Sequence, residues 1–181
     1  MKLRSLTTGL VAAVLGLTAC AGGNRAHLDL VMEPGPGTAV DSVAATFATE
    51  TGAENPETVA TVQFDGRDIR LVRYTDPSSG EQCLAAVDGD TDPNSWCQQE
   101  FTPGYFGTVE LSDEFRPVAG EAVLMAPDGT ATAQVWTVFG YVIAVEPLDG
   151  LAYFAWNPDW GRASAIRLLD DAGEVIGMRS L

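Results

Sequence analysis

Three aspartates stand at alternate positions in one segment of the chain, Asp88, Asp90 and Asp92. Ca²⁺ binds several carboxylate and carbonyl oxygens, so these residues are a candidate calcium site. The pattern departs from a calcium loop at Pro93, where the sharp turn needs glycine, and at Gln99, where a bidentate glutamate is needed. Aspartate in turns also accepts hydrogen bonds from its own backbone. We favour this second interpretation, a solvated acidic turn, and the sequence then requires no cofactor.

A second group of candidate site residues lies in an aromatic segment near the C-terminus. The turn sequence Asn157-Pro158-Asp159 separates Trp156 from Trp160, and Arg162 follows. A strand that leads into such a turn ends near Trp156, so we expect this ring in the core and Trp160 partly exposed. Trp160, Asn157 and Arg162 are therefore candidates for binding a sugar or a partner protein. Packing in the core is the favoured interpretation of the aromatic segment as a whole.

Nucleophilic and acid–base catalysis find little support in the sequence. The single histidine, His27, lies among small and polar residues, where no packed shell would orient it. Lys2 is the only lysine, and the chain has no Gly-x-Ser-x-Gly, Walker or His-Glu-x-x-His motif. Carboxylates remain available, because glycoside hydrolysis needs only two of them and the chain has 25. An enzyme is not favoured, and no catalytic residue is assigned.

The N-terminus has the features of a bacterial export signal. Lys2 and Arg4 precede an apolar segment, residues 10–17, which falls short of the about 20 apolar residues that span a bilayer. This segment leads into Leu17-Thr18-Ala19-Cys20, which resembles the lipobox of bacterial lipoproteins. The resemblance implies cleavage before Cys20 and attachment of a diacylglycerol to its sulfur.

Lipidation of Cys20 would divide the chain into three parts. Residues 1–19 would be a cleaved signal peptide, residues 20–27 a short tether that begins with the lipidated cysteine, and residues 28–181 one globular domain of ordinary size. The mature protein would be held at the extracytoplasmic face of the cell membrane. The membrane is thus the first expected partner, through the lipid anchor.

The two remaining cysteines, Cys83 and Cys97, form an even pair. In an oxidising compartment outside the cytoplasm such a pair is expected to be a disulfide. It would close a loop of about 15 residues and contribute about 3 kcal/mol in the chain-entropy model. The spacing is not that of a Cys-x-x-Cys metal or redox motif, and no histidine accompanies the pair. We therefore expect a structural disulfide.

The charge balance excludes one class of partner. The formal charge is −15, and it becomes −17 once Lys2 and Arg4 are removed with the signal peptide. Such an acidic surface repels nucleic acid, so no nucleic-acid partner is expected. The hydrophobic fraction of 46% is that of a folded chain rather than a disordered one.

Turn sequences predict three β-hairpins in the body of the chain. With Asp65-Gly66 as a two-residue turn, Val62 faces Ile69 and Ala60 faces Leu71, while polar side chains occupy the opposite face. That alternation is typical of a half-buried antiparallel pair. Two further acidic turns with glycine predict hairpins between residues 121–125 and 130–136 and between residues 163–169 and 174–178.

One segment has helical spacing. In residues 38–51 the apolar side chains recur with helical periodicity, Asp41 is a candidate N-cap and Gly52 follows the end. Residues 33–37, Glu-Pro-Gly-Pro-Gly, predict a break in the chain before the helix. The expected fold is mainly β, an antiparallel β-sandwich or partly open barrel with one short N-terminal helix.

The segment from Val59 to Cys97 also resembles a pattern in small exported actinobacterial proteins. The matching residues are Asp65-Gly66-Arg67 between two strands and Gly80-Glu81-Gln82-Cys83-Leu84, with a second cysteine further on. The resemblance covers about forty residues and implies a fold and a disulfide, without any chemistry.

These features together predict a lipid-anchored extracytoplasmic module that binds a ligand or has a structural role in the envelope. Two alternatives remain: a carboxylate-based hydrolase of an envelope glycan, and a sensory or regulatory module that binds a membrane partner. Two carboxylates converging in a pocket would favour the hydrolase, whereas a flat exposed apolar patch would favour the partner binder. Envelope proteins and glycans are therefore the expected partners besides the membrane.

Overall fold

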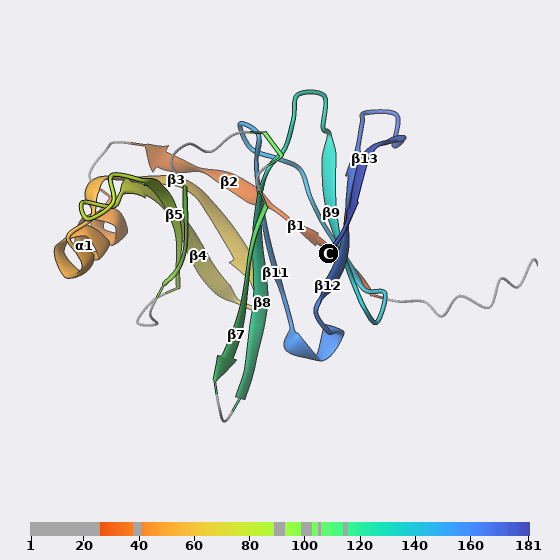
Figure 1. Cartoon of the computed structure of the whole chain (residues 1–181), viewed down its shortest axis with the longest axis horizontal. Coiled ribbons are helices and arrows are strands. Elements are labelled where there is room, and N and C mark those ends of the chain that lie inside the picture. The colour runs from red at the N-terminus through yellow and green to blue at the C-terminus, as the bar shows by residue number, and fades with distance from the viewer. Residues whose placement is uncertain (1–25, 38–40, 89–92, 99–102, 105, 114–115) are drawn as a thin grey trace, which may run out of the picture.

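The computed structural model describes residues 26–37, 41–88, 93–98, 103–104, 106–113 and 116–181 (Figure 1). Strands predominate in this part of the chain, together with one α-helix, α1 (Ser42–Thr51), and one 3-10 helix, η1 (Pro158–Trp160). The strands are β1 (His27–Leu30), β2 (Met32–Gly37), β3 (Glu54–Phe64), β4 (Arg67–Thr75), β5 (Gln82–Val87), β6 (Asn94–Gln98), β7 (Phe106–Asp113), β8 (Arg116–Met125), β9 (Thr132–Thr137), β10 (Val142–Val145), β11 (Leu151–Trp156), β12 (Ala163–Leu169) and β13 (Val175–Ser180).

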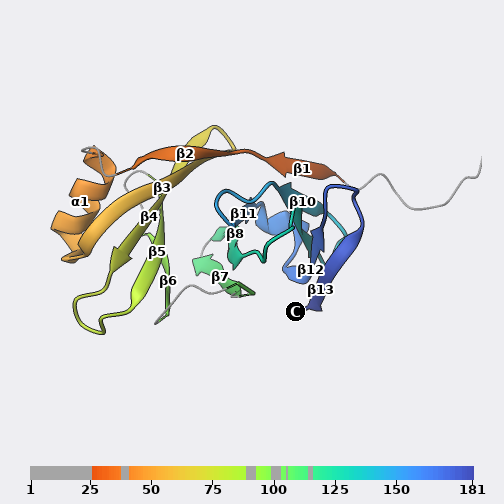
Figure 2. The ribbon, with the colours of Figure 1, turned by 90° about the horizontal axis from the view of Figure 1, so that it is seen from above.

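The described strands form three open sheets that lie as three layers (Figures 1 and 2). The outer sheet A has the strand order β1-β10-β9-β12-β13, and the outer sheet B has the order β2-β3-β4-β5-β6. Between them lies the central sheet, with the order β11-β8-β7. The predicted mainly β sandwich with one short helix is confirmed, with a third layer that the sequence did not indicate.

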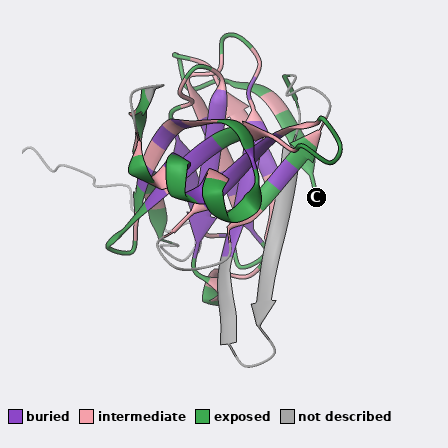
Figure 3. Ribbon diagram, turned by 90° about the vertical axis from the view of Figure 1, so that its left-hand side faces the viewer, coloured by how far each residue is buried: buried purple, intermediate pink, exposed green. Residues whose placement is uncertain are grey.

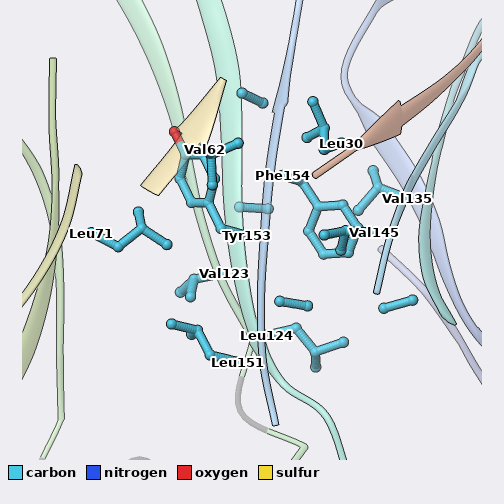
Figure 4. Packing of buried hydrophobic residues seen from close by; sticks show 14 of the residues in the cluster. Leu30, Val62, Leu71, Val123, Leu124, Val135, Val145, Leu151, Tyr153 and Phe154 are labelled. Carbon is cyan, nitrogen blue, oxygen red and sulfur yellow. The ribbon is translucent and has the colours of Figure 1, made fainter. Parts of the chain in front are cut away.

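Strand β11 is the centre of the core, and all six of its residues are buried. Tyr153 points toward Val62 of sheet B, while Phe154 points the other way, toward Val135 and Val145 of sheet A (Figure 4). A strand that is covered on both faces needs an unbroken apolar run rather than alternation of apolar and polar residues. The composition of β11 meets that need, and buried residues of all three sheets join one hydrophobic cluster.

A close contact between Trp156 and Gly120 fixes one end of the central sheet. The two residues pair across β11 and β8, and a Cβ atom on Gly120 would lie 2.3 Å from the Trp156 ring. Only glycine leaves room for the indole here. The indole Nε1 donates a hydrogen bond of 2.9 Å to the carbonyl oxygen of Gly161, which ties β11 to the loop beyond η1. Trp156 is 2% exposed, so its predicted burial is confirmed.

The hairpin of β3 and β4 has the predicted register. Val62 pairs with Ile69 and Ala60 with Leu71, and all four side chains are buried. Asp65 and Gly66 have φ angles of 51° and 74°, as a two-residue turn of type I′ requires. The predicted hairpin of β12 and β13 also forms.

The predicted hairpin between residues 121–125 and 130–136 is wrong. The turn at Gly129 does form, with φ of 84°, but the strands that flank it lie in different sheets. β8 pairs with β7 and β11, whereas β9 pairs with β10 and β12. The chain therefore crosses at this turn from the central sheet to sheet A, because each strand finds a longer-range partner.

Helix α1 covers the outer face of sheet B and has the predicted caps. The Asp41 carboxylate accepts a hydrogen bond of 3.0 Å from the backbone of Val43, and Gly52 ends the helix in the left-handed region with φ of 76°. The expected first turn, residues 38–40, lies outside the described residues. Figure 3 shows the helix, exposed over much of its length, in front of buried stretches of the strands. Buried side chains of α1 and of the sheet beneath it form a second, smaller core; these are Ala44, Phe47, Ala53, Val72 and Ala85.

Two N-terminal segments that were predicted to be a tether and a chain break belong to strands, and each pairs with a neighbouring strand. His27, placed in the tether, is the first residue of β1, which runs parallel to β10. The Glu33–Gly37 break belongs to β2, which pairs with β3 through an irregular register between Pro34 and Gly37. Proline and glycine weaken a ladder without preventing it when the strand lies at a sheet edge, as β2 does.

The predicted disulfide between Cys83 and Cys97 is present, with a sequence separation of 14. The two cysteines face one another on β5 and β6, and the bond fastens the edge strand β6 to sheet B. Within the described residues no helix is long and apolar enough to cross a membrane.

Candidate functional site

An exposed apolar patch lies at one end of sheet A, in two loops that are distant in the sequence. We call it the aromatic tip, and its members are Val138, Phe139, Tyr141 and Trp160. Phe139 is 60% exposed and Val138 46% exposed. The Tyr141 and Trp160 rings are stacked, with centroids 5.0 Å apart and planes at 10°.

Glycine at position 161 holds the two loops of the aromatic tip together. A Cβ atom there would lie 2.6 Å from Val138 and 3.0 Å from the Phe139 ring, so both side chains rest on the bare backbone. The backbone nitrogen of Val138 donates a hydrogen bond of 2.9 Å to the carbonyl oxygen of Arg162. The tip is thus a single surface built from the β9–β10 turn and the loop around η1.

The predicted binding residues lie at or beside this tip. Trp160 is half-buried, in line with its predicted partial exposure, and its ring belongs to the tip. Asn157 is exposed and caps η1, because its side chain accepts a hydrogen bond of 2.9 Å from the backbone of Asp159. Arg162 is exposed next to Gly161. Ligand binding by these residues stays a prediction.

The other half of the tip was not predicted from the sequence. Residues 138–141, Val-Phe-Gly-Tyr, form the turn between β9 and β10 and carry its most exposed aromatic ring. The available sequence signal for this turn was an aromatic residue directly beside Gly140, between two segments rich in β-branched residues. That signal marks a turn but does not indicate that Trp160 lies beside it.

A buried polar group lies between sheet B and the central sheet. Glu121 of β8 is 9% exposed, and its Oε2 accepts a hydrogen bond of 2.7 Å from Asn94. The hydroxyl of Tyr153, on β11, lies close to this carboxylate without an aligned hydrogen bond to it among the described residues. The Trp96 ring meets the Tyr153 ring edge-on, with centroids 6.2 Å apart.

Burial dominates the ionisation of this group. It raises the pKa of Glu121, and the hydrogen bond from Asn94, the nearby Tyr153 hydroxyl and the charge of Arg67 offset only part of that effect. Burial also raises the pKa of Tyr153, and the nearby Glu121 charge raises it further. A carboxyl group with a raised pKa is suited to donate a proton, provided that a substrate reaches it.

Only one of the three candidate calcium residues, Asp88, lies in the described part of the chain. Asp88 forms an ion pair with Arg67 of the β3–β4 hairpin, while Asp90 and Asp92 lie outside the described residues. Among the residues that the structure places, no group of three potential ligands could hold a metal ion. The calcium site therefore stays a prediction.

A cleft of about 290 Å³ opens between sheet B and the central sheet. Its apolar lining comes from β3, β5, β8, β11 and the loop before β11, and consists of Val59, Leu84, Met125, Leu148 and Leu151. Polar groups lie in the lining at Glu57, Arg73 and Asp149. A mainly apolar cleft with a few polar groups, near the lower end of the usual size range, is typical of a small-molecule site.

Two features of sheet B shape one side of this cleft. A Cβ atom on Gly35 would lie 2.0 Å from the carbonyl oxygen of Thr58, so only glycine lets β2 approach β3 here. Glu57 and Arg73 face one another across β3 and β4, and their side chains form an ion pair of 2.7 Å. This pair leaves Asp149, an exposed turn residue, as the other carboxylate of the lining.

The cleft and the aromatic tip lie at opposite ends of the same two strands. β10 runs from the tip residue Tyr141 toward Leu148 of the cleft, and β11 returns from Leu151 to η1 and Trp160. A six-residue strand such as β11 spans about 20 Å. The first described residue, Ala26, lies at the tip end, because its carbonyl oxygen accepts a hydrogen bond of 3.3 Å from Val142.

No family model, curated protein or solved structure matches this chain.

Replacing Glu121 with glutamine should stabilise the domain at neutral pH. Because the pKa of Glu121 is raised above its usual value near 4.5, the folded state holds the proton more tightly than the unfolded state. Wild-type stability is therefore lost as the pH rises from 4.5 through the raised pKa, whereas glutamine stays neutral and still accepts from Asn94. Urea unfolding across this range should show the advantage of Glu121→Gln growing with pH.

The exposed Glu146, replaced by glutamine, is the matched control and should show no such growth. An advantage of Glu121→Gln that shrinks as the pH rises would contradict the assignment of burial as the dominant effect.

Proposed function

We propose that this chain is a lipid-anchored extracytoplasmic module that binds a small, mainly apolar molecule in the cleft between sheet B and the central sheet. The observation that carries the proposal is the cleft itself, with its apolar lining and an ion pair at one side. Its place at the far end of β10 and β11 from Ala26 supports the proposal, because a cleft there faces away from an anchor at Cys20.

The distribution of carboxylates favours binding over hydrolysis. A carboxylate-based hydrolase needs two such groups on either side of the scissile bond in one cleft. Glu57 and Asp149 line the cleft, but Glu57 is held in the ion pair with Arg73. Glu121, the carboxyl group whose pKa is raised, is not among the lining residues.

The anchor is tested by Cys20→Ser in the native host. We expect the wild-type chain to incorporate labelled palmitate and to float with membranes, and the variant to do neither, because the lipidated sulfur is lost. A chain that carries Cys83→Ala and Cys97→Ala is the control, since it loses two cysteines but keeps Cys20. Persistent labelling of Cys20→Ser would refute the anchor.

The cleft is tested with indole as a small apolar probe and methionine methyl resonances as the readout. Met125 lines the cleft, whereas Met178 is 66% exposed on the edge strand β13 and serves as an internal control. Titration of the lipidated protein in nanodiscs should shift the Met125 resonance to saturation and leave that of Met178 unchanged.

Filling the cleft should abolish this response. Val59→Trp places a large ring in the lining, while Val43→Trp, at an equally half-buried position on α1, should leave the response intact. Equal, unsaturated shifts of both methionines would show partitioning without a site and would overturn the proposal.

A further inference from the structure

The aromatic tip places large apolar side chains in solvent at the end of the molecule where the described chain begins. His27 pairs with Val142 in the parallel ladder of β1 and β10, and Val142 directly follows the tip residue Tyr141. The start of β1, the β9–β10 turn and η1 lie together at the lower right of the molecule in Figure 1. The tip and the point where the chain leaves the fold are therefore neighbours.

The length of chain before the fold limits how far the tip can lie from a lipidated Cys20. Five residues lie between Cys20 and Ala26, which makes six steps along the chain, and a fully extended chain spans at most about 3.5 Å for each step. The anchor and the tip end of sheet A are therefore held within about 20 Å of one another, whatever path the tether takes. A lipid anchor at Cys20 would therefore keep this end of the domain close to the bilayer.

We propose that the aromatic tip docks on the membrane and inserts into the headgroup region of the bilayer that holds the lipid anchor. This inference rests on the proposed anchoring at Cys20. The bilayer is the expected binding partner of the tip, because the tether to a lipidated Cys20 brings lipid to this surface without the help of another protein.

The composition of the tip suits the bilayer interface. Tryptophan and tyrosine are enriched at the level of the lipid headgroups, because their rings have an apolar body and a polar edge. Phe139 and Val138 add wholly apolar contact. The exposed side chains beside the tip carry both signs of charge, with Arg162 on one side of Trp160 and Asp159 on the other. Two docking elements, a lipid chain and an apolar surface, hold a protein at a bilayer more firmly than one.

Docking would fix the orientation of the whole domain. With the tip in the interface, β10 and β11 lead away from the membrane toward the cleft at Leu148 and Leu151. A tether alone would leave the domain free to turn about Cys20. The tip therefore acts as the second point of attachment that holds the cleft open to the extracytoplasmic space.

The test measures quenching of tryptophan fluorescence by lipids that carry bromine on the acyl chain near the headgroup. The mature lipidated protein, residues 20–181, is placed in vesicles of phosphatidylcholine and phosphatidylglycerol. We expect partial quenching in the wild type that Trp160→Phe removes, because the rings of Trp96 and Trp156 are buried in the core. Trp136→Phe, which removes a half-buried ring of β9 outside the tip, should leave the quenching in place.

Phe139→Asp should cost most of the quenching of Trp160, because a charge at the most exposed ring of the tip opposes insertion. Met178→Asp is the matched control, since this side chain is similarly exposed but lies on β13. Phe139→Ser is a milder variant with the same expected direction, and thermal unfolding of all the variants checks that the fold is retained.

The outcomes separate docking from anchoring. Protein that incorporates palmitate and floats with the vesicles, but whose Trp160 is not quenched, overturns docking and leaves the anchor in place. Equal quenching in Phe139→Asp and the wild type also overturns docking. If the protein incorporates no palmitate, the anchor is refuted and this proposal falls with it. Docking would survive that result only if the unlabelled protein still showed quenching that Phe139→Asp removes.

Discussion

The burial of β11 on both faces is the constraint on which the rest of the structure depends. A strand whose six side chains are all buried needs a covering layer on each side, and β11 meets sheet B through Tyr153 and sheet A through Phe154. Aromatic side chains contribute most to the energy of such a core. Gly120 admits the Trp156 ring between the layers, and that ring in turn holds the loop that carries Trp160.

The three-layer arrangement also explains where the polar and open regions lie. The central sheet has three described strands and sheet B has five, so sheet B is the wider of the two facing layers. The space between them is filled by Trp96 and Tyr153 at one place, with Glu121 and Asn94 beside them, and opens as the cleft at another. The buried carboxyl group lowers stability at neutral pH, whereas the cleft offers a surface to a ligand.

Local features of this fold could be predicted from the sequence because neighbouring residues determine them. Asp65-Gly66 sets the register of β3 and β4, and Asp41 and Gly52 set the ends of α1. The disulfide of Cys83 and Cys97 is local in the same sense, because a single hairpin of β5 and β6 brings the two sulfurs together.

Pairings between distant segments could not be predicted in this way. The turn at Gly129 has the sequence of a hairpin, yet β8 and β9 separate, because β11 and β12 provide partners from later in the chain. The parallel pairing of β1 with β10 joins residues more than one hundred positions apart, and no local signal marks it. The aromatic tip depends on the same long-range packing, so the sequence indicated Trp160 but not Phe139.

The orientation of the domain at the membrane is the central claim of this account, and paramagnetic relaxation tests it most directly. The lipidated protein would be studied in nanodiscs that contain a lipid with gadolinium chelated at its headgroup. Docking through the aromatic tip predicts the strongest relaxation at the amides of Phe139 and Gly161 and the weakest at those of Asp149 and Gly150, because about 20 Å of strand separates the two ends. Equal relaxation at both ends, or the reverse order, would contradict it.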